Sequence, residues 1–362
     1  MPKPQEQLYD DILKQAHRVE ARANALSDEL VRTLENVRFK LLAKLAELQE
    51  KRLTSDSWDA QPLTRRRAYL EAQREAVDEL IDEVYAGMGS QVEDAAADTM
   101  AYAASAQETS LKTLFGIGGG ATNVTVGMVT AWAASHTVDG LLLSEWLKTL
   151  GRGTADRIVA AGREALIMGY GTRKTATLLR AQGVEGSIAG LNNLARTFLM
   201  SASNYARDTA AERLVGDMLK GWQYVATLDG RTCPVCGADD NRFFPVDKPR
   251  PNLPRHFSCR CLYVPVVNEA DAAAPVERPA VKHEERTVHH RDGSTSTKFK
   301  VSAVEHTTEN YSQWLKRQLK EDPAFVRSIL GKTRFELFQA GEIDLRKMVV
   351  DGRIKRLSEL QK

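Results

Sequence analysis

The 362-residue sequence predicts a mainly α-helical protein that carries one small β/loop module. Apolar residues recur at steps of three and four along the N-terminal region, which is typical of amphipathic helices. Only 7% of the residues are aromatic, whereas Ala and Leu are abundant, which favours helices over a β-sandwich. All four cysteines lie in one short window. We expect a long-helix hairpin over 1–115, a helical domain over 116–267 ending in a Cys/His module at 229–265, a linker with a possible hairpin over 268–300, and a small basic α(+β) unit over 301–362.

Composition excludes several classes of protein. The 50 Lys and Arg residues against 48 Asp and Glu leave a net charge of +2, which argues against a surface built to coat nucleic acid. The 43% hydrophobic content excludes wholesale disorder. No apolar run reaches the roughly 18 residues of a bilayer span, and the first residues lack the apolar core of a signal peptide. We therefore expect no membrane anchor and a soluble protein made and used in cytoplasm.

The N-terminal region predicts two long helices. A helix over 8–48 has the stripe Leu26, Leu30, Leu34, Val37, Leu41, Leu45 and Leu48. Turn residues at 54–62 interrupt the pattern. The second helix turns Leu63, Leu70, Val77, Leu80, Ile81 and Val84 inward, and an Ala-rich stretch over 91–115 is a further helical segment. An antiparallel hairpin that packs within the chain is favoured over a coiled coil for a partner.

The glycine run at 116–121 predicts a joint between domains. A phosphate-binding loop would follow a strand and open a helix, and this run follows a predicted helix. Helices are then expected over 141–150, 157–168, 173–179 and 191–219, with turns at 169–171 and 182–186. The last of these helices has the stripe Leu194, Phe198, Ala202 and Tyr205, which we expect to be core.

The cysteine window predicts a cross-linked module. After a strand over 222–228, Cys233 and Cys236 are separated by two residues, and the sequence between them and a second group is rich in proline. The second group is His256, Cys259 and Cys261. Zn²⁺ takes four such ligands tetrahedrally, so we expect four of these five residues to bind it. One of Cys259 and Cys261 would point away if the chain is extended. A disulfide is the alternative, disfavoured by reducing cytoplasm. No H-x-E or HExxH motif accompanies the cysteines, so we expect a structural site, no catalytic residues and no enzyme.

The C-terminal region changes in composition. Residues 268–279 are rich in Ala, Pro and Glu and predict a linker, and 287–301 predict a β-hairpin. Asp322 and Pro323 predict a helix start, and Gly341 a stop. Apolar surface comes from Phe325, Ile329, Leu330, Phe335, Leu337 and Phe338. Residues 298–362 contain 14 Lys and Arg against 9 Asp and Glu, a net charge of +5. That excess would help at a DNA-facing surface, but a solvated helical face is favoured.

The cysteine window also resembles a known family. It matches a signature of an aromatic strand, an Asp-x-Arg-Thr-Cys-x-x-Cys turn, a proline-rich loop and a Pro-x-His-x-x-Cys-Arg-Cys ending. The matching residues are Trp222, Asp229, Arg231, Thr232, Cys233, Cys236, Pro254, His256, Cys259, Arg260 and Cys261. They resemble the phage head morphogenesis family, the minor head proteins similar to the F protein of phage Mu. The likeness covers about 141–265, with Phe198 where the family usually has Glu. The tail over 311–360 resembles a C-terminal unit often attached in such proteins.

The resemblance implies a structural minor head protein of the capsid of a tailed bacteriophage. It would act in head morphogenesis at the portal vertex and in DNA packaging or delivery. The implied partners are the portal protein, the major capsid or scaffolding protein, and packaged DNA. The implied location is the virion, in the head interior or at the portal vertex, with host cytoplasm during assembly.

The alternative is a zinc-dependent nucleic-acid-binding protein or HNH-like nuclease that uses His256 and Asp229. Arg231 and Arg260 separate the two hypotheses. A nuclease would aim these arginines at phosphate, whereas a scaffold would turn them toward carboxylates such as Asp229 or Asp240.

Overall fold

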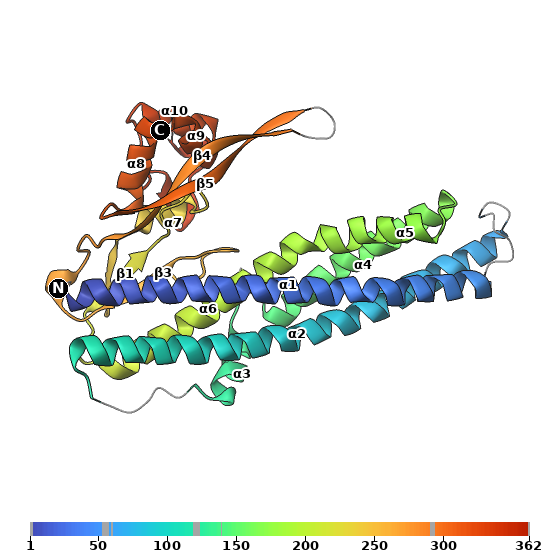
Figure 1. Cartoon of the computed structure of the whole chain (residues 1–362), viewed down its shortest axis with the longest axis horizontal. Coiled ribbons are helices and arrows are strands. Elements are labelled where there is room, and N and C mark those ends of the chain that lie inside the picture. The colour runs from blue at the N-terminus through green and yellow to red at the C-terminus, as the bar shows by residue number, and fades with distance from the viewer. Residues whose placement is uncertain are drawn as a thin grey trace.

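The protein is a long helical bundle with a small sheet module and a C-terminal unit at one end (Figure 1). The computed structural model describes residues 3–52, 58, 61–118, 124–138, 140–289 and 294–360. Most of these residues are helical, and the sheets are small and antiparallel, so the predicted mainly α class is confirmed. No helix in the described ranges is long and apolar enough to cross a bilayer.

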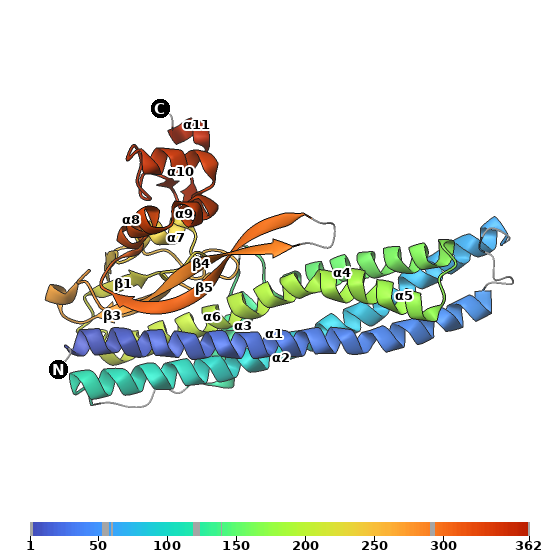
Figure 2. The same cartoon turned by 45° about the horizontal axis from the view of Figure 1, so that its top comes forward.

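Two antiparallel helices form the spine of the bundle. α1 (Pro4–Arg52) and α2 (Leu63–Phe115) lie side by side in both views of the chain (Figures 1 and 2). The α1 stripe is buried from Leu26 to Leu45 against α2 residues such as Ile81 and Met88. The stripe therefore packs within the chain, as expected. The predicted turn at 54–62 lies largely outside the described residues.

Two details of the predicted hairpin were wrong. The second helix and the Ala-rich stretch form one continuous α2, which runs through Gly87 and Gly89 without interruption. Leu63, which was expected to face inward, is 77% exposed because it is the first residue of α2 and lies beyond the core. α2 ends at Gly116, whose φ of 65° closes the helix in the left-handed region. Residues 119–121 of the glycine run lie outside the described residues.

Four further helical segments complete the bundle. They are α3 (Val126–Ser135), α4 (Leu143–Ile167), α5 (Thr172–Leu179) and α6 (Gly186–Val215). The turn at 169–171 is confirmed, with Gly169 at a φ of 60°. The turn expected at 182–186 was wrong, because a π-helical segment (Arg180–Glu185) runs directly into α6. Tyr205 was expected in the core but is 40% exposed, on the rim of the bundle.

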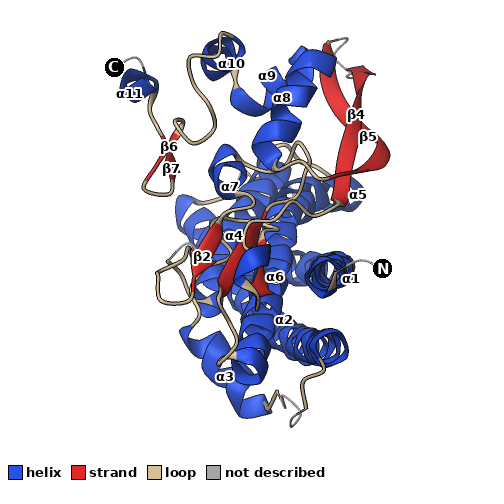
Figure 3. Cartoon of the chain, turned by 90° about the vertical axis from the view of Figure 1, so that its left-hand side faces the viewer, coloured by secondary structure: helices blue, strands red, loops and turns tan. Residues whose placement is uncertain are grey.

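A three-stranded sheet sits beside the first turns of α1 and the last turns of α6. The order is β2 (Phe243–Pro245), β1 (Gly221–Val225), β3 (Leu262–Val266), with both pairings antiparallel. The end-on view shows these strands against the helices (Figure 3). The predicted strand at 222–228 is confirmed in type but ends at Val225. Leu8, Tyr9 and Ile12 of α1 pack into the core of this module.

The chain then forms a long β-ribbon and a compact helical unit. After a 3₁₀ turn (Glu269–Asp271), β4 (Arg278–His289) pairs with β5 (Thr295–Thr307). This confirms the hairpin and lengthens it, so that β4 begins inside the predicted linker. Its turn, 290–293, lies outside the described residues. The unit contains α8 (Tyr311–Glu321), α9 (Pro323–Leu330), α10 (Lys332–Gln339), β6 (Val349–Val350), β7 (Arg353–Ile354) and α11 (Leu357–Leu360).

The predicted start of α9 is confirmed. The Asp322 side chain accepts a hydrogen bond from the Phe325 amide, and Pro323 is the first helical residue. Gly341, at a φ of 74°, follows α10 as expected. Of the six apolar residues, Phe325, Leu330, Phe335 and Phe338 are buried, and Ile329 and Leu337 are partly buried.

Candidate metal centre and its ion-pair frame

Cys233 and Cys236 are positioned by the start of a short helix, α7 (Pro234–Asp239). Cys233 is the N-terminal cap, and its sulfur accepts a hydrogen bond from the Cys236 amide at 3.4 Å. Pro234 occupies the first helical position, where an amide hydrogen would have no partner within the helix, so the lack of one in proline costs no hydrogen bond. The C-x-x-C spacing thus turns both sulfurs toward one point.

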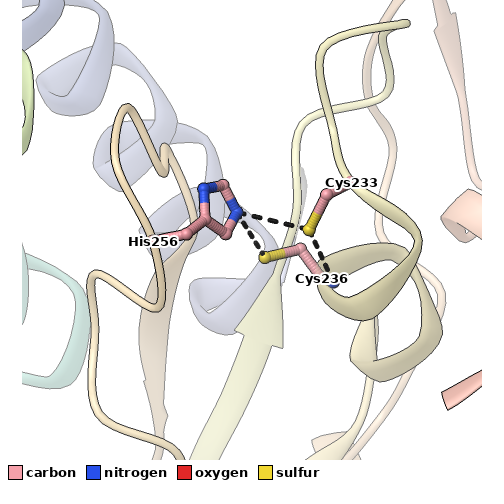
Figure 4. A group of neighbouring side chains, drawn as sticks. All are labelled: Cys233, Cys236 and His256. Atoms are coloured by element: carbon pink, nitrogen blue, oxygen red, sulfur yellow. Dashed lines mark hydrogen bonds between the residues drawn. The ribbon is translucent and has the colours of Figure 1, made fainter. Parts of the chain in front are cut away.

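His256 reaches the same point from the loop that leads to β3. Its Nε2 lies 3.3 Å from the Cys233 sulfur and 3.4 Å from the Cys236 sulfur (Figure 4). The other ring nitrogen, Nδ1, lies 2.8 Å from the carbonyl oxygen of Phe257, to which it donates. That bond keeps a proton on Nδ1, so Nε2, the nitrogen that faces the sulfurs, would bind a metal after losing its own proton.

The remaining two cysteines also join this cluster. The sulfurs of Cys236 and Cys259 are 4.0 Å apart, and those of Cys236, Cys259 and Cys261 all lie within 4.8 Å of one another. The expectation that Cys259 or Cys261 points away was wrong. Ser258, directly before Cys259, is left-handed at a φ of 55°, and β3 begins only at Leu262, so both cysteines lie outside the strand.

The loop that carries the second group is anchored to the bundle. The Ser258 amide donates to Thr197 Oγ1 at 2.8 Å, and its hydroxyl donates to Asn193 Oδ1 at 2.8 Å. Both acceptors lie on α6. The candidate ligands are therefore held against the bundle on one side and on α7 on the other.

The donor set fits a tetrahedral zinc ion. Bond lengths of about 2.0–2.3 Å to nitrogen and sulfur place neighbouring ligand atoms roughly 3.5–3.8 Å apart. The separations of 3.3 and 3.4 Å between nitrogen and sulfur and of 4.0 Å between sulfurs lie within about 0.3 Å of these values. All four cysteines are free, and 4.0 Å is about twice the length of an S–S bond. Thiolate and imidazole are the ligands that structural zinc prefers.

The pKa values in the cluster favour a negative thiolate on Cys233 beside a positive imidazolium on His256. Hydrogen bonding from Cys236, aided by His256, lowers the pKa of the Cys233 thiol to about 4. Hydrogen bonding to Cys233 and Cys259 raises the pKa of His256 to about 11. Thiolate is thus favoured beside a positive group, the electrostatic setting that a bound cation also provides.

A buried ion pair frames the cluster. Arg260 donates from Nη1 to Asp229 Oδ2 at 2.7 Å and from Nη2 to Oδ1 at 2.6 Å, a bidentate pair. Burial alone would raise the pKa of Asp229, but the Arg260 guanidinium outweighs it and the pKa is lowered. Thr232 donates to the Thr227 carbonyl at 2.6 Å and closes the turn.

Arg231 lies at the edge of this frame. Its side chain is 59% exposed and lies 3.4 Å from Glu20 and 3.5 Å from Asp229. Both motif arginines therefore face local carboxylates.

A second buried pair was not predicted. Arg278 donates to both carboxylate oxygens of Asp240, which also accepts from the backbone amides of Ala226 at 2.8 Å and Tyr311 at 2.6 Å. Both charged side chains are almost fully buried. This cluster ties α7, β1, β4 and α8 together. Arg278 lies in the stretch expected to be a linker, where no local pattern marks it.

The fold and site define a mainly α protein with a Cys/His-clamped sheet module between a helical bundle and a C-terminal unit. Residues 156–264 match the family model described as Phage Mu protein F like protein, which confirms the resemblance over this segment. The matched range runs from α4 through the metal centre to β3. It indicates a protein of phage head morphogenesis. The chain matches no curated protein and no solved structure.

Proposed function

We propose that the chain is a structural minor head protein of a tailed phage, which acts at the portal vertex in head morphogenesis and in DNA packaging or delivery. The observation that carries the proposal is the convergence of five metal-ligand candidates from two distant segments, inside the range that matches the Mu F-like model. The cluster would act as a staple that holds the module together. The virion, in the head interior or at the portal vertex, is then its place of action.

Zn²⁺ is the proposed cross-link. Cys233, Cys236 and His256 would hold it, with Cys259 or Cys261 as the fourth ligand. The ion would supply a cross-link that offsets the entropy of ordering the proline-rich loop between the two groups. Cys236 belongs to both groups of three residues, so it is the central ligand in either arrangement.

The arrangement of acids supports a non-enzymatic role. A metal-dependent nuclease needs a carboxylate and a histidine that can face water or substrate. Both oxygens of Asp229 accept from Arg260, and Asp240 is saturated by Arg278 and two amides. Asp239 pairs with Arg255 at 2.7 Å. His256 Nε2 faces sulfur.

The portal protein is the proposed main partner, with capsid or scaffolding protein and packaged DNA as further ones. The test is to assemble heads of the same phage with and without the portal protein and to probe purified particles for this chain. We expect the chain in heads that contain the portal and its loss from heads that lack it. Retention at full copy number without the portal would contradict a portal-vertex location.

A second experiment addresses the nuclease alternative. Purified protein is incubated with supercoiled plasmid and with Mg²⁺, Mn²⁺ or Zn²⁺, beside the variant His256→Ala. We expect no cleavage above the level of the variant. Nicking that disappears in His256→Ala but persists in His17→Ala would favour the nuclease.

A further inference from the structure

Most residues of the β4–β5 ribbon are exposed or only partly buried. The ribbon extends from the C-terminal unit and lies apart from the helices of the bundle (Figures 1 and 3). The two strands pair with each other along their length, from Arg278 opposite Thr307 to His289 opposite Thr295. Neither strand packs extensively on another helix or strand.

The two faces of the ribbon differ in chemistry. On one face, His283 stacks on Phe325 of α9 with ring centroids 4.2 Å apart, and Phe299 contacts the same ring at 5.3 Å. The opposite face is set by the alternation of side chains along a strand. Its charged members in the outer half are Glu284, Arg286, Lys298 and Lys300, all of them exposed, and Val288 and Ser296 lie beyond them on the same face.

The charged face has a net positive charge, because its three cations are accompanied by a single carboxylate, that of Glu284. Arg286 lies directly opposite Lys298, and Glu284 lies opposite Lys300. Within the described part of the chain, no carboxylate forms an ion pair with Arg286, Lys298 or Lys300, whereas Lys282 nearer the base pairs with Glu305 at 2.9 Å. Two like charges directly across a sheet destabilise it unless an anion lies between them. Charges also keep an exposed ribbon from pairing with other strands, but that purpose requires no like-charge pair.

We propose that this face of the ribbon binds duplex DNA through its phosphates. A two-stranded ribbon fits the major groove, and phosphates on either side of the groove would neutralise Arg286, Lys298 and Lys300. The inference rests on the proposed function for the presence of DNA beside the protein. It assigns the contact to the ribbon rather than to the helices of the basic C-terminal unit.

The test measures binding of the full chain to a short fluorescent duplex over a series of NaCl concentrations. The variant Arg286→Thr/Lys298→Thr/Lys300→Thr removes the three cations and keeps residues that favour strands. The control, Lys40→Gln/Arg65→Gln/Lys148→Gln, removes the same charge from exposed positions on α1, α2 and α4. We expect the ribbon variant to lower the slope of log K against log salt by about 2.7, at about 0.9 per phosphate contact. The control should leave the slope close to that of the unmodified protein.

Folding of the ribbon variant is checked by its melting temperature, which should not fall because the three side chains are exposed. An equal decrease of the salt slope in both variants would show that net charge, and not the ribbon face, determines DNA binding, and it would overturn the proposal. An unmodified chain that binds no duplex at low salt would also overturn it. So would a loss of self-association in the ribbon variant with DNA binding unchanged, because the ribbon would then pair with a second copy. None of these results bears on whether the chain enters heads, which the particle experiment decides separately.

Discussion

Asp229 and Arg260 form a charge pair with side chains only 7% and 11% exposed. Removal of one partner leaves a buried charge without compensation, which in other proteins costs about 3–5 kcal/mol. We therefore expect Asp229→Asn, which keeps the size of the side chain, to lower the free energy of unfolding by roughly 3 kcal/mol. Urea denaturation measures the change. Asp10→Asn, which breaks the exposed pair with Lys14, is the control and should have little effect.

The same pair predicts how stability depends on pH. The pKa of Asp229 is lowered in the folded protein from its ordinary value of 3.8. A lowered pKa contributes stability above the ordinary value, and the contribution is lost as pH falls through the folded value. The stability difference between the unmodified protein and Asp229→Asn should therefore be constant near neutral pH and shrink below about pH 4. A difference that stays unchanged into acid would contradict the ion pair.

Cys236 is the cysteine whose loss should matter most, because it lies in both groups of candidate ligands. We expect native protein to contain one zinc ion per chain. Cys236→Ser and His256→Ala should lose it, whereas at least one of Cys259→Ser and Cys261→Ser should retain it. Elemental analysis with thiol counting checks this, with His17→Ala as the histidine control. Absence of metal together with absence of free thiols would establish disulfides instead.

Helix α7 is packed so closely that one of its positions accepts only glycine. A Cβ on Gly237 would lie 2.2 Å from the ring of Tyr311, which is fully buried. Gly237→Ala should therefore destabilise the protein by about 1–3 kcal/mol through overpacking. Gly87 in α2 has open space at its Cβ, so Gly87→Ala should stabilise by about 0.5–1 kcal/mol. Thermal unfolding of the two variants compares them, and equal shifts would contradict the packing at α7.

Close packing around glycine also explains two helical segments that the sequence did not predict correctly. Periodicity predicts the helices of the bundle, but it divides α4 into two segments and predicts a turn before α6, where the structure has continuous helix. Gly151 and Gly153 lie between the two predicted segments of α4, and Gly183 and Gly186 lie in the predicted turn. In the structure, Gly151 lies against Tyr85, and a Cβ on Gly183 would lie 2.6 Å from Ile158. These glycines permit close approach of helices, a requirement that depends on neighbours distant in sequence.

The sheet module joins the two larger parts of the molecule. Its core includes Leu8 and Ile12 from the start of α1, whereas Leu228 and Ala238 pack with Tyr311 in the core of the C-terminal unit. A separate core fills the rest of the bundle. Loosening of the module should therefore weaken its packing on the start of α1 and on the C-terminal unit, and leave the packing of most of the bundle unchanged.

Metal removal tests this arrangement. After addition of a zinc chelator, we expect faster hydrogen exchange at 221–266 and in the C-terminal helices, with protection retained in the middle of α1 and α2. The physical reason is that the bundle core contains none of the candidate ligands. Exchange that rises equally along the whole chain would indicate one cooperative unit.

Local sequence by itself determined the helical class, the N-terminal hairpin, the capped start of α9 and the identity of the five candidate ligands. These features depend on spacing along a few turns or on residue type, both of which are visible in one dimension. Only the tertiary structure decided that all five ligands converge, that Arg260 lies on Asp229, and that Arg278 closes on Asp240 across 38 positions of sequence. Pairing over such distances depends on which segments the cores bring together, and no local pattern encodes it.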